Sequence, residues 1–368
     1  MLEEKEKYHF QRQISLTEVG EIGQEKLKSS GVLVIGAGGL GCPALLYLCA
    51  AGIGKIGIVD FDTVHESNLH RQILFSTKDI GNNKALAAKS KLSIQFNSIE
   101  IAAHPEKLTT KNAIQLFSQY DIIVDATDNF ATRYLINDAS ILSNKPYVFG
   151  AIFKFEGQVT VFNYLGSPSY RCLFPEAPRN VPTCEEVGVF GFLCGIIGTK
   201  MANESVKLIL GIGEVLIGKI EYYHALKSTT TILTYQKVDK EIESIKSVDF
   251  NFESFDYNLF CGIEPPTKES VDTATFNDLL KKESIQIFDI RQDWEEPKLS
   301  YNDIIALPIQ NIESAAAVLD PTKKIIVICQ NGSRSKIAVD YLKTKYNFKD
   351  VANLESGMLG WEKNQATN

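Results

Sequence analysis

GVLVIGAGGLG, residues 31–41, decides the fold of the first part of the chain. A short apolar, β-branched run leads into a glycine-rich turn, and CPALLYLCAAG then follows as a predicted helix. Such a turn between a strand and a helix places backbone N–H groups and the positive end of the helix dipole beside a phosphate. The sequence therefore predicts a nucleotide site at the glycines Gly36, Gly38, Gly39 and Gly41.

Strands and helices alternate from this motif to Gly150, which predicts a parallel, doubly wound, Rossmann-like α/β sheet. Beyond Gly150 the segments QVTVFNY, KIEYYHA and TTTILTYQKV alternate polar and apolar residues. They predict antiparallel strands that extend the sheet, with a helix over residues 191–210 between them.

The chain is predicted to contain two domains, as its 368 residues allow. Residues 1–238 form the expected nucleotide-binding domain. Residues 239–266 are acidic and aromatic without clear periodicity and contain Pro265-Pro266, so we expect a linker there. Residues 267–368 alternate strands and helices again and predict a small α/β domain.

The composition excludes several classes of protein. A net charge of −7 and a pI of about 5.4 argue against general binding to nucleic acid or anionic membranes. The opening MLEEKEKYHF does not resemble a signal peptide, and no apolar run approaches the ~20 residues of a membrane span. Seven scattered cysteines favour a cytoplasmic, reduced protein in which some cysteines are functional.

The glycine motif alone leaves NAD and ATP open. Asp60 ends the second strand, where a ribose-binding carboxylate is expected, and Asp62 follows in the same VDFD segment. The residues that follow favour ATP because they gather cations and amides: Asn68, Arg71 and Gln72 in SNLHRQ, Lys84, and Asp128-Asn129 after the strand DIIVDAT. Hydride transfer needs an apolar face, whereas attack of a carboxylate on the α-phosphorus of ATP requires cations around the phosphates. Asp128 would bind Mg²⁺.

Residues 8–238 resemble the MoeB/ThiF group, relatives of the ubiquitin-activating enzymes, most specifically in SNLHRQ, DATDN and EGQVTVF. The resemblance implies adenylylation of the C-terminal glycine of a ubiquitin-like sulfur carrier of the MoaD/ThiS type that ends in Gly-Gly. It implies that Gly39 and Asp60 contact ATP, that Asn68, Arg71, Gln72 and Lys84 hold ribose and phosphates, and that Asp128 binds Mg²⁺. The position of Arg12 reaches the ATP of a second subunit in this group, which implies a homodimer.

Two further features are interpreted by resemblance. Cys184 in PTCEEVGVFG matches a cysteine that attacks the activated carrier or its persulfide, although a small buried hydrophobic role is the alternative. Related chains carry two C-x-x-C pairs that bind zinc, but the matching positions here read S-Y-R-C, ending at Cys172, and N-L-F-C, ending at Cys261. Two thiolates do not complete a tetrahedral site, so we predict no zinc.

CQNGSRS, from Cys329 to Ser335, follows the apolar strand KIIVI and opens a helix. Backbone amides, a helix N-terminus and the charge of Arg334 would stabilise a thiolate or persulfide at Cys329. A phosphatase loop has a similar shape but usually reads H-C-x₅-R, and here Ile328 stands before the cysteine and Arg334 comes one residue early. Together with FDIR and ESGMLGW, this region resembles rhodanese-like domains, which carry sulfane sulfur on the loop cysteine.

The sequence thus favours an ATP-dependent adenylyltransferase and sulfurtransferase that acts on a sulfur carrier in molybdopterin, thiamine or a related biosynthesis. The sulfur donor would be a cysteine desulfurase or thiosulfate. The alternatives are an adenylylating relative that acts on a small molecule or a tRNA nucleoside, an NAD-dependent oxidoreductase, and a non-enzymatic scaffold for a carrier protein.

Overall fold

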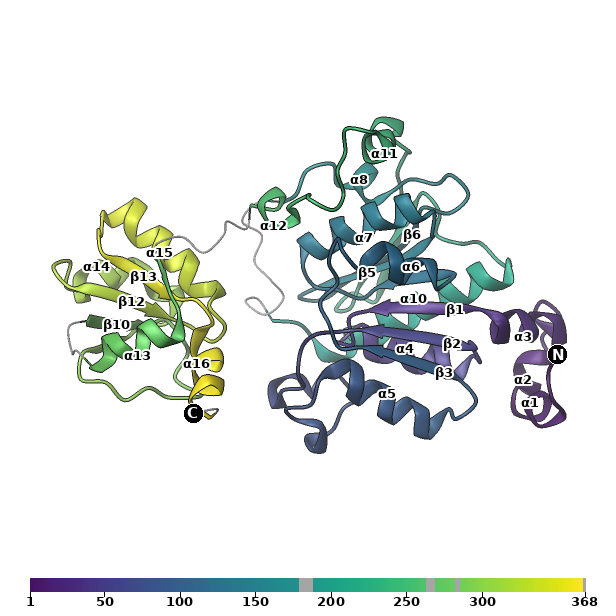
Figure 1. The fold of residues 1–368 in the computed structure, drawn as a ribbon, viewed down its shortest axis with the longest axis horizontal. Helices are drawn as coiled ribbons and strands as arrows, with labels where there is room; N and C mark the ends of the chain where they lie inside the picture. The colour runs from purple at the N-terminus through teal and green to yellow at the C-terminus, as the bar shows by residue number, and fades with distance from the viewer. Residues whose placement is uncertain (179–187, 263–268, 282–284, 367–368) are drawn as a thin grey trace. The chain divides into compact units, whose positions relative to one another are not determined.

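The computed structural model describes residues 1–178, 188–262, 269–281 and 285–366. The chain divides into two compact units, Met1–Ile263 and Glu264–Asn368 (Figure 1). In the part of the chain that the structure describes, no helix is long and apolar enough to cross a membrane.

The first unit is built on an eight-stranded sheet with the order β3-β2-β1-β4-β5-β6-β7-β8. The first five of these strands are mutually parallel, and β5 to β8 are antiparallel to one another. The strands are β1 (Gly31–Ile35), β2 (Lys55–Val59), β3 (Glu100–His104), β4 (Ile122–Asp125), β5 (Tyr147–Phe153), β6 (Glu156–Phe162), β7 (Lys219–His224) and β8 (Thr229–Thr234). The predicted fold class, a doubly wound sheet extended by antiparallel strands, is confirmed.

Helices cover both faces of the parallel strands (Figure 1). In β1, Val32 and Val34 belong to a core with α4 (Gly41–Ala50), α5 (Lys84–Gln95) and α10 (Gly191–Leu210). Leu33 and Ile35 point to the other face, into a core with α6 (Ala113–Ser118) and α7 (Phe130–Ser143). A strand buried on both sides reads as a continuous apolar run, which is why GVLVI shows no alternation.

Short elements complete this unit outside the two helical layers. The chain begins with α1 (Glu4–His9), α2 (Gln11–Ile14) and α3 (Gly20–Ser29). Two 3₁₀ turns, η1 (Glu66–Asn68) and η2 (Thr77–Asp79), lie between β2 and α5, and α8 (Tyr170–Leu173) follows β6.

The second unit has a five-stranded, fully parallel sheet with the order β11-β10-β12-β13-β9. Its strands are β9 (Ser270–Val271), β10 (Ile285–Asp289), β11 (Ile304–Ala306), β12 (Lys324–Ile328) and β13 (Val351–Leu354). Its helices are α13 (Thr273–Lys281), the turn η3 (Ile309–Ser314), α14 (Ala315–Val318), α15 (Ser333–Tyr346) and α16 (Gly357–Ala366). The strand β12 is buried at four of its five positions and leads directly into the cysteine loop.

The structure differs from the expected linker at residues 239–262. This segment contains α11 (Asp239–Lys246) and α12 (Tyr257–Phe260) and packs against α7 of the first unit. Its aromatic residues join the core beneath α7, where Phe252 and Tyr257 are buried. The aromatic composition that suggested an irregular linker is therefore the cause of its docking, since large rings contribute much apolar area on burial.

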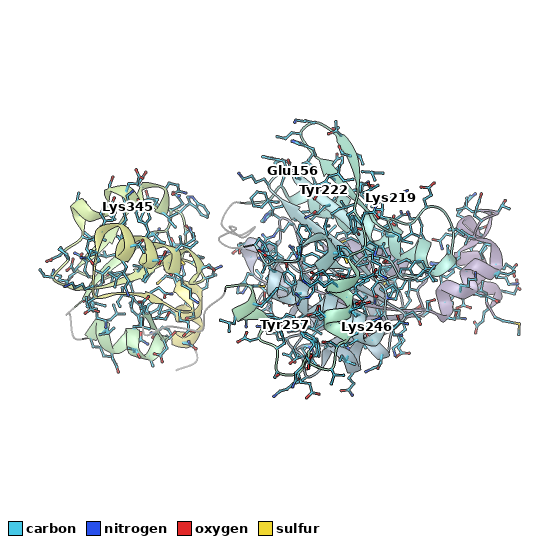
Figure 2. The ribbon with its side chains drawn as sticks, turned by 90° about the horizontal axis from the view of Figure 1, so that it is seen from above. Glu156, Lys219, Tyr222, Lys246, Tyr257 and Lys345 are labelled. Atoms are coloured by element: carbon cyan, nitrogen blue, oxygen red, sulfur yellow. The ribbon has the colours of Figure 1, made fainter. Side chains whose placement is uncertain are left out.

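A buried ionic network fastens this segment to the domain. Arg171 of α8 donates two hydrogen bonds to the carboxylate of Asp138, at 2.8 and 2.7 Å, and the Tyr257 hydroxyl donates to the same carboxylate at 2.8 Å. Figure 2 labels Tyr257 within the larger unit. The guanidinium of Arg171 also lies over the rings of Tyr134 and Phe260, 5.0 and 4.8 Å from their centroids. Every charge in the network is paired, as burial demands.

We expect Asp138→Asn to destabilise the first unit by about 3 kcal/mol or more, because Arg171 would remain buried without its counter-charge. In a unit of this size that loss lowers the melting temperature by roughly 6–12 °C. Calorimetry of the full chain measures it, with the transition of the second unit as an internal reference. The matched control is Glu214→Gln, which breaks the exposed ion pair with Lys219 and should leave both transitions in place. Figure 2 labels Lys219. If the melting temperature of the first unit were unchanged in Asp138→Asn, this would contradict the proposed role of the network.

Candidate functional site

The glycine-rich loop between β1 and α4 has positions that only glycine fits. Gly36 adopts a φ of +94°, and a Cβ there would lie 2.9 Å from the carbonyl oxygen of Ala126. A Cβ at Gly41 would overlap the carbonyl oxygen of Gly36, and one at Gly39 would lie 2.7 Å from the sulfur of Cys194. The loop is therefore tightly packed underneath, between the ends of β1 and β4 and the start of α10.

The acidic residues predicted at the end of β2 adjoin this loop. The carboxylate of Asp60 accepts hydrogen bonds from the backbone N–H of Ala37, at 2.8 Å, and of Asp62, at 2.9 Å. Burial raises the pKa of Asp60, while the nearby charge of Lys84 and these two hydrogen bonds act to lower it. A carboxylate fixed beside the glycine loop suits a ribose hydroxyl.

Lys84, the first residue of α5, is brought to the same place. Its ammonium group lies 3.1 Å from the carboxylate of Asp62, and its backbone N–H donates to the carbonyl of Asp62 at 2.8 Å. Asn83 caps α5 and donates to the carbonyl of Asp60 at 3.0 Å. The predicted residues at 60, 62 and 84 therefore form one connected group.

The SNLHRQ segment folds as η1 and the turn after it, against the glycine loop. Backbone N–H groups of Arg71 and Gln72 both donate to the carbonyl of Asn68. A Cβ on Gly39 would lie 3.7 Å from the Arg71 side chain, and one on Gly38 would lie 3.7 Å from the Gln72 amide nitrogen. The side-chain oxygen of Gln72 is buried without a hydrogen-bond partner in the described residues. The side chains of Arg71 and Gln72 thus lie against the glycine loop, and their contact with phosphate stays a prediction.

Asp128 and Asn129 follow β4, beside the glycine loop. Asp128 is exposed. Asn129 instead caps α7 by accepting a hydrogen bond from the N–H of Thr132 at 2.9 Å. Its side chain therefore has a structural partner in this structure, and nucleotide binding by Asn129 stays a prediction.

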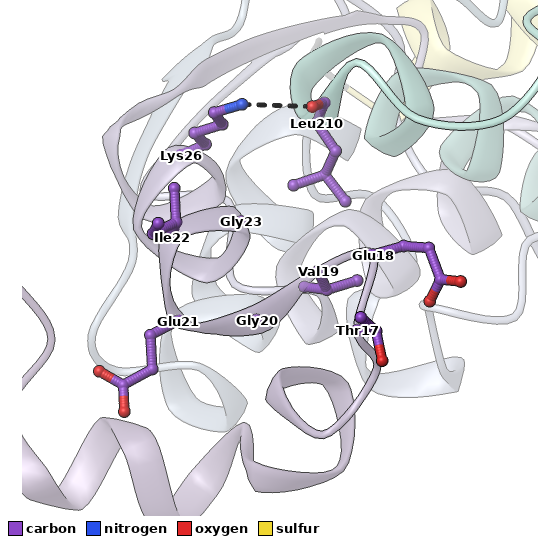
Figure 3. Close-up of a pocket in the computed structure, with 9 residues that line it drawn as sticks. All are labelled: Thr17, Glu18, Val19, Gly20, Glu21, Ile22, Gly23, Lys26 and Leu210. Atoms are coloured by element: carbon purple, nitrogen blue, oxygen red, sulfur yellow. Dashed lines mark hydrogen bonds between the residues drawn. The ribbon is translucent and has the colours of Figure 1, made fainter.

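One predicted residue of the ATP site, Arg12, is not brought to this group. Arg12 is an exposed residue of α2, a helix that packs on α3. Cys184 lies outside the described residues. A hollow of about 470 Å³ lies between α3 and the end of α10, lined by residues that include Val19, Lys26 and Leu210 (Figure 3). None of its lining residues belongs to the predicted ATP site.

Cys172 and Cys261, at the positions where related chains have zinc ligands, have other surroundings. The sulfur of Cys172 accepts hydrogen bonds from the backbone N–H groups of Ser169 and Val238, both at 3.3 Å. Cys261 is buried in the core beneath α7, and burial raises the pKa of its thiol to about 11. Among the described residues no group of three or more His, Cys, Asp or Glu side chains could hold a metal ion. The loss of zinc stays a prediction.

Cys329, at the end of β12, lies at the centre of the loop in the second unit. Its side chain is fully buried, and its sulfur accepts hydrogen bonds from the backbone N–H groups of Gly332, at 3.1 Å, and Ser335, at 3.3 Å. Gly332 has a φ of +92°, and a Cβ there would overlap the carbonyl oxygen of Glu355. The sulfur therefore lies in a cradle of backbone donors at the N-terminus of α15, of which Gly332 is among the residues expected and Ser335 lies just beyond them. The persulfide role of Cys329 stays a prediction.

The guanidinium of Arg334 makes an ion pair with Glu295, including a hydrogen bond of 2.9 Å. Burial acts to raise the pKa of Glu295, but hydrogen bonds from Arg334 and from the N–H of Gln292 hold it below its ordinary value. Sequence analysis did not find this partner, although WEE lies in the loop after β10. Arg334 thus tethers that loop to the cysteine loop, and its expected direct effect on the sulfur stays a prediction.

Sequence reasoning also missed residues that support the first site from below. Gly191 starts α10, where a Cβ would lie 2.6 Å from the carbonyl oxygen of His70, and Cys194 contacts Gly39 in the next turn. Asp125 is buried at the start of the DATDN segment. Only the burial of polar residues in the folded chain identifies them, and a single sequence does not display it.

The two units define a protein that joins a glycine-loop nucleotide site to a loop that holds a cysteine sulfur among backbone amides. The ThiF family model matches residues 10–244, and the rhodanese-like domain model matches residues 272–364. The chain belongs to the ThiF family and carries a C-terminal rhodanese-like domain.

Named relatives include adenylyltransferases and enzymes that are both adenylyltransferase and sulfurtransferase. The probable adenylyltransferase/sulfurtransferase MoeZ of Mycobacterium tuberculosis is 38% identical, over 98% of this chain and 94% of that protein. The sulfur carrier protein adenylyltransferase of Thermus thermophilus is 46% identical, over 71% of this chain and 98% of that protein. The adenylyltransferase and sulfurtransferase MOCS3 of Aedes aegypti is 36% identical, over 96% of this chain and 86% of that protein.

Solved structures support the fold of the first unit. PaaA superposes with a TM-score of 0.55 at 23% identity, covering 64% of this chain and 76% of that one. MccB of E. coli, crystallised with ATP, superposes with a TM-score of 0.52 at 22% identity, covering 58% of this chain and 66% of that one. At these identities the likeness concerns the fold alone.

Proposed function

We propose that this protein uses ATP to adenylylate the C-terminal glycine of a ubiquitin-like sulfur carrier ending in Gly-Gly, and then transfers sulfur to it from a persulfide on Cys329. The observation that carries the proposal is the presence of both sites in one chain. A ThiF-type glycine loop lies with Asp60, Arg71 and Lys84, and a rhodanese-type cradle holds Cys329.

In the first step the carrier's terminal carboxylate attacks the α-phosphorus of ATP. An oxygen–phosphorus bond forms, the bond to the β-phosphate oxygen breaks, and pyrophosphate leaves. Arg71 and Lys84 would neutralise the charge that develops on the phosphates, with Lys84 oriented by Asp62. Asp128, an exposed carboxylate beside the glycine loop, suits Mg²⁺, which is usually bound through one or two carboxylates and substrate phosphates. When bound, the ion would offset the phosphate charge.

In the second step the terminal sulfur of the Cys329 persulfide attacks the acyl-adenylate carbonyl and displaces AMP. The product is an acyl disulfide between the carrier and Cys329. A second thiol then attacks the Cys329 sulfur, which releases the carrier thiocarboxylate and leaves a protein disulfide that an external thiol reductant restores. We assign this second thiol to Cys184.

The remaining partners follow from the same proposal. A cysteine desulfurase or thiosulfate would load Cys329 in the cytoplasm. Arg12, which is exposed on α2, would reach the nucleotide of a second subunit in a homodimer. The thiocarboxylate carrier would serve molybdopterin, thiamine or a related biosynthesis.

Isotope exchange between pyrophosphate and ATP tests the first step. Wild-type protein should catalyse the exchange only with a carrier that ends in Gly-Gly. A carrier that lacks its last glycine is the matched control and should support none, because the attacking carboxylate is then displaced by one residue. NAD should not alter the exchange. Absence of exchange with several Gly-Gly carriers would overturn the proposed function.

A further inference from the structure

Thr127, the residue before Asp128, makes three hydrogen bonds to two buried charged side chains. Its N–H and hydroxyl both donate to the same carboxylate oxygen of Asp125, at 3.0 and 2.6 Å. Its carbonyl accepts a hydrogen bond from the guanidinium of Arg133 at 3.0 Å. Every hydrogen-bonding group of this residue that faces the protein is therefore paired with a charged side chain.

Both charged groups lie in the core rather than in the nucleotide site. Asp125 ends β4 and is fully buried, and Arg133 in α7 has 7% of its surface exposed. The guanidinium of Arg133 is stacked between Phe130 and Phe149, 5.2 and 5.3 Å from the ring centroids. Arg133 therefore contacts the Thr127 carbonyl from the core side of the site, and its positive charge is opposite in sign to that of the Asp125 carboxylate.

Burying two charged side chains costs free energy of folding, so the arrangement is expected to serve a function. One carboxylate oxygen of Asp125 and the Nε of Arg133 are buried without a hydrogen-bond partner in the described residues. A capped helix start or a simple turn does not require two buried charges. Asp125 and Arg133 instead fix the backbone on both sides of the Thr127 peptide, and the next residue is the exposed Asp128.

We infer that Asp125, Thr127 and Arg133 are positioning residues that fix the backbone on which Asp128 stands, so that its carboxylate can bind the metal ion on ATP. The inference rests on the proposed function, because it assigns the metal contact to Asp128. The 2.6 Å bond from the Thr127 hydroxyl to Asp125 is the part that one substitution removes without changing the shape of the side chain.

Calorimetric titration of the full chain with ATP, with and without Mg²⁺, tests this inference. Thr127→Val removes the hydroxyl and keeps the shape, and Thr127→Ser keeps the hydroxyl as the matched control. We expect the gain in ATP affinity that Mg²⁺ provides to fall by about tenfold in Thr127→Val, the effect of one hydrogen bond to a charged group. The affinity for ATP without Mg²⁺ should stay unchanged. Thr127→Ser should retain most of the gain.

Each outcome has a separate meaning. A wild-type gain that persists in Thr127→Val would overturn the positioning role alone. Equal loss of affinity with and without Mg²⁺ would also overturn it, since a merely structural defect acts on both. A wild-type protein that binds ATP in neither condition would overturn the proposed function itself. If Thr127→Val does not fold, Arg133→Lys replaces it, because Lys keeps the charge but loses the fixed geometry of the guanidinium.

Discussion

The Cys329→Ala variant is expected to lose all transfer of sulfane sulfur while pyrophosphate–ATP exchange continues at the wild-type rate. The sulfur of Cys329 is the atom that the N–H groups of Gly332 and Ser335 surround, and alanine leaves this cradle empty. The exchange depends on the glycine loop of the other compact unit, which the substitution leaves untouched. Mass spectrometry for the +32 Da persulfide and an assay of thiosulfate sulfurtransferase measure the first activity, and isotope exchange measures the second.

Cys49→Ala is the matched control for this variant. Cys49 is buried in α4, where burial raises the pKa of its thiol to about 12, so it forms almost no thiolate at neutral pH. Its removal should leave both activities in place. A persulfide that survives in Cys329→Ala would place the sulfur on another cysteine and contradict the assignment.

Asp128→Ala is expected to keep the transfer of sulfane sulfur and to lower the rate of pyrophosphate–ATP exchange by about 10²–10³-fold. This is the usual effect of removing one preorganised electrostatic group from an active site. Asp128 is exposed and follows Ala126 and Thr127, which lie against Gly36, so alanine removes a charge without disturbing the core. Persulfide formation on Cys329 should continue. Exchange measured over a range of Mg²⁺ concentrations checks the prediction.

Asp128→Asn separates charge from shape. An amide keeps the size of the side chain but is a poorer ligand for Mg²⁺, so its exchange rate should lie close to that of the alanine variant. The control Asp239→Ala removes an exposed carboxylate of α11 and should have no effect. If Asp128→Asn retained wild-type exchange, the carboxylate would not be the metal contact.

The order of strands and helices could be predicted because the apolar runs are short, the glycine turns are marked, and the alternation is regular. The cradle of Cys329 followed from the same kind of local pattern, in which a strand, a glycine loop and a helix are contiguous. The segment over residues 239–262, expected as a linker, makes contacts with α7, about one hundred residues earlier in the chain, which a local pattern does not reveal.

Side-chain pairing was the part that local pattern could not supply. Arg334 was expected at the sulfur, but it pairs with Glu295, 39 residues away in sequence. The sequence could not predict that Asp125 and Arg133 both bind the Thr127 peptide, because this arrangement depends on their burial in the folded chain. Asn129 lies in a motif that suggests nucleotide contact, yet its amide caps α7.

The complete burial of the Cys329 side chain bears on how sulfur reaches it. To load this cysteine, a donor must bring its own sulfur into the loop, or the loop must open around the thiol. A small ion such as thiosulfate and a persulfide held on a second protein would therefore differ in how fast they load the domain, and the bulk of the donor becomes a selection step in the supply of sulfur.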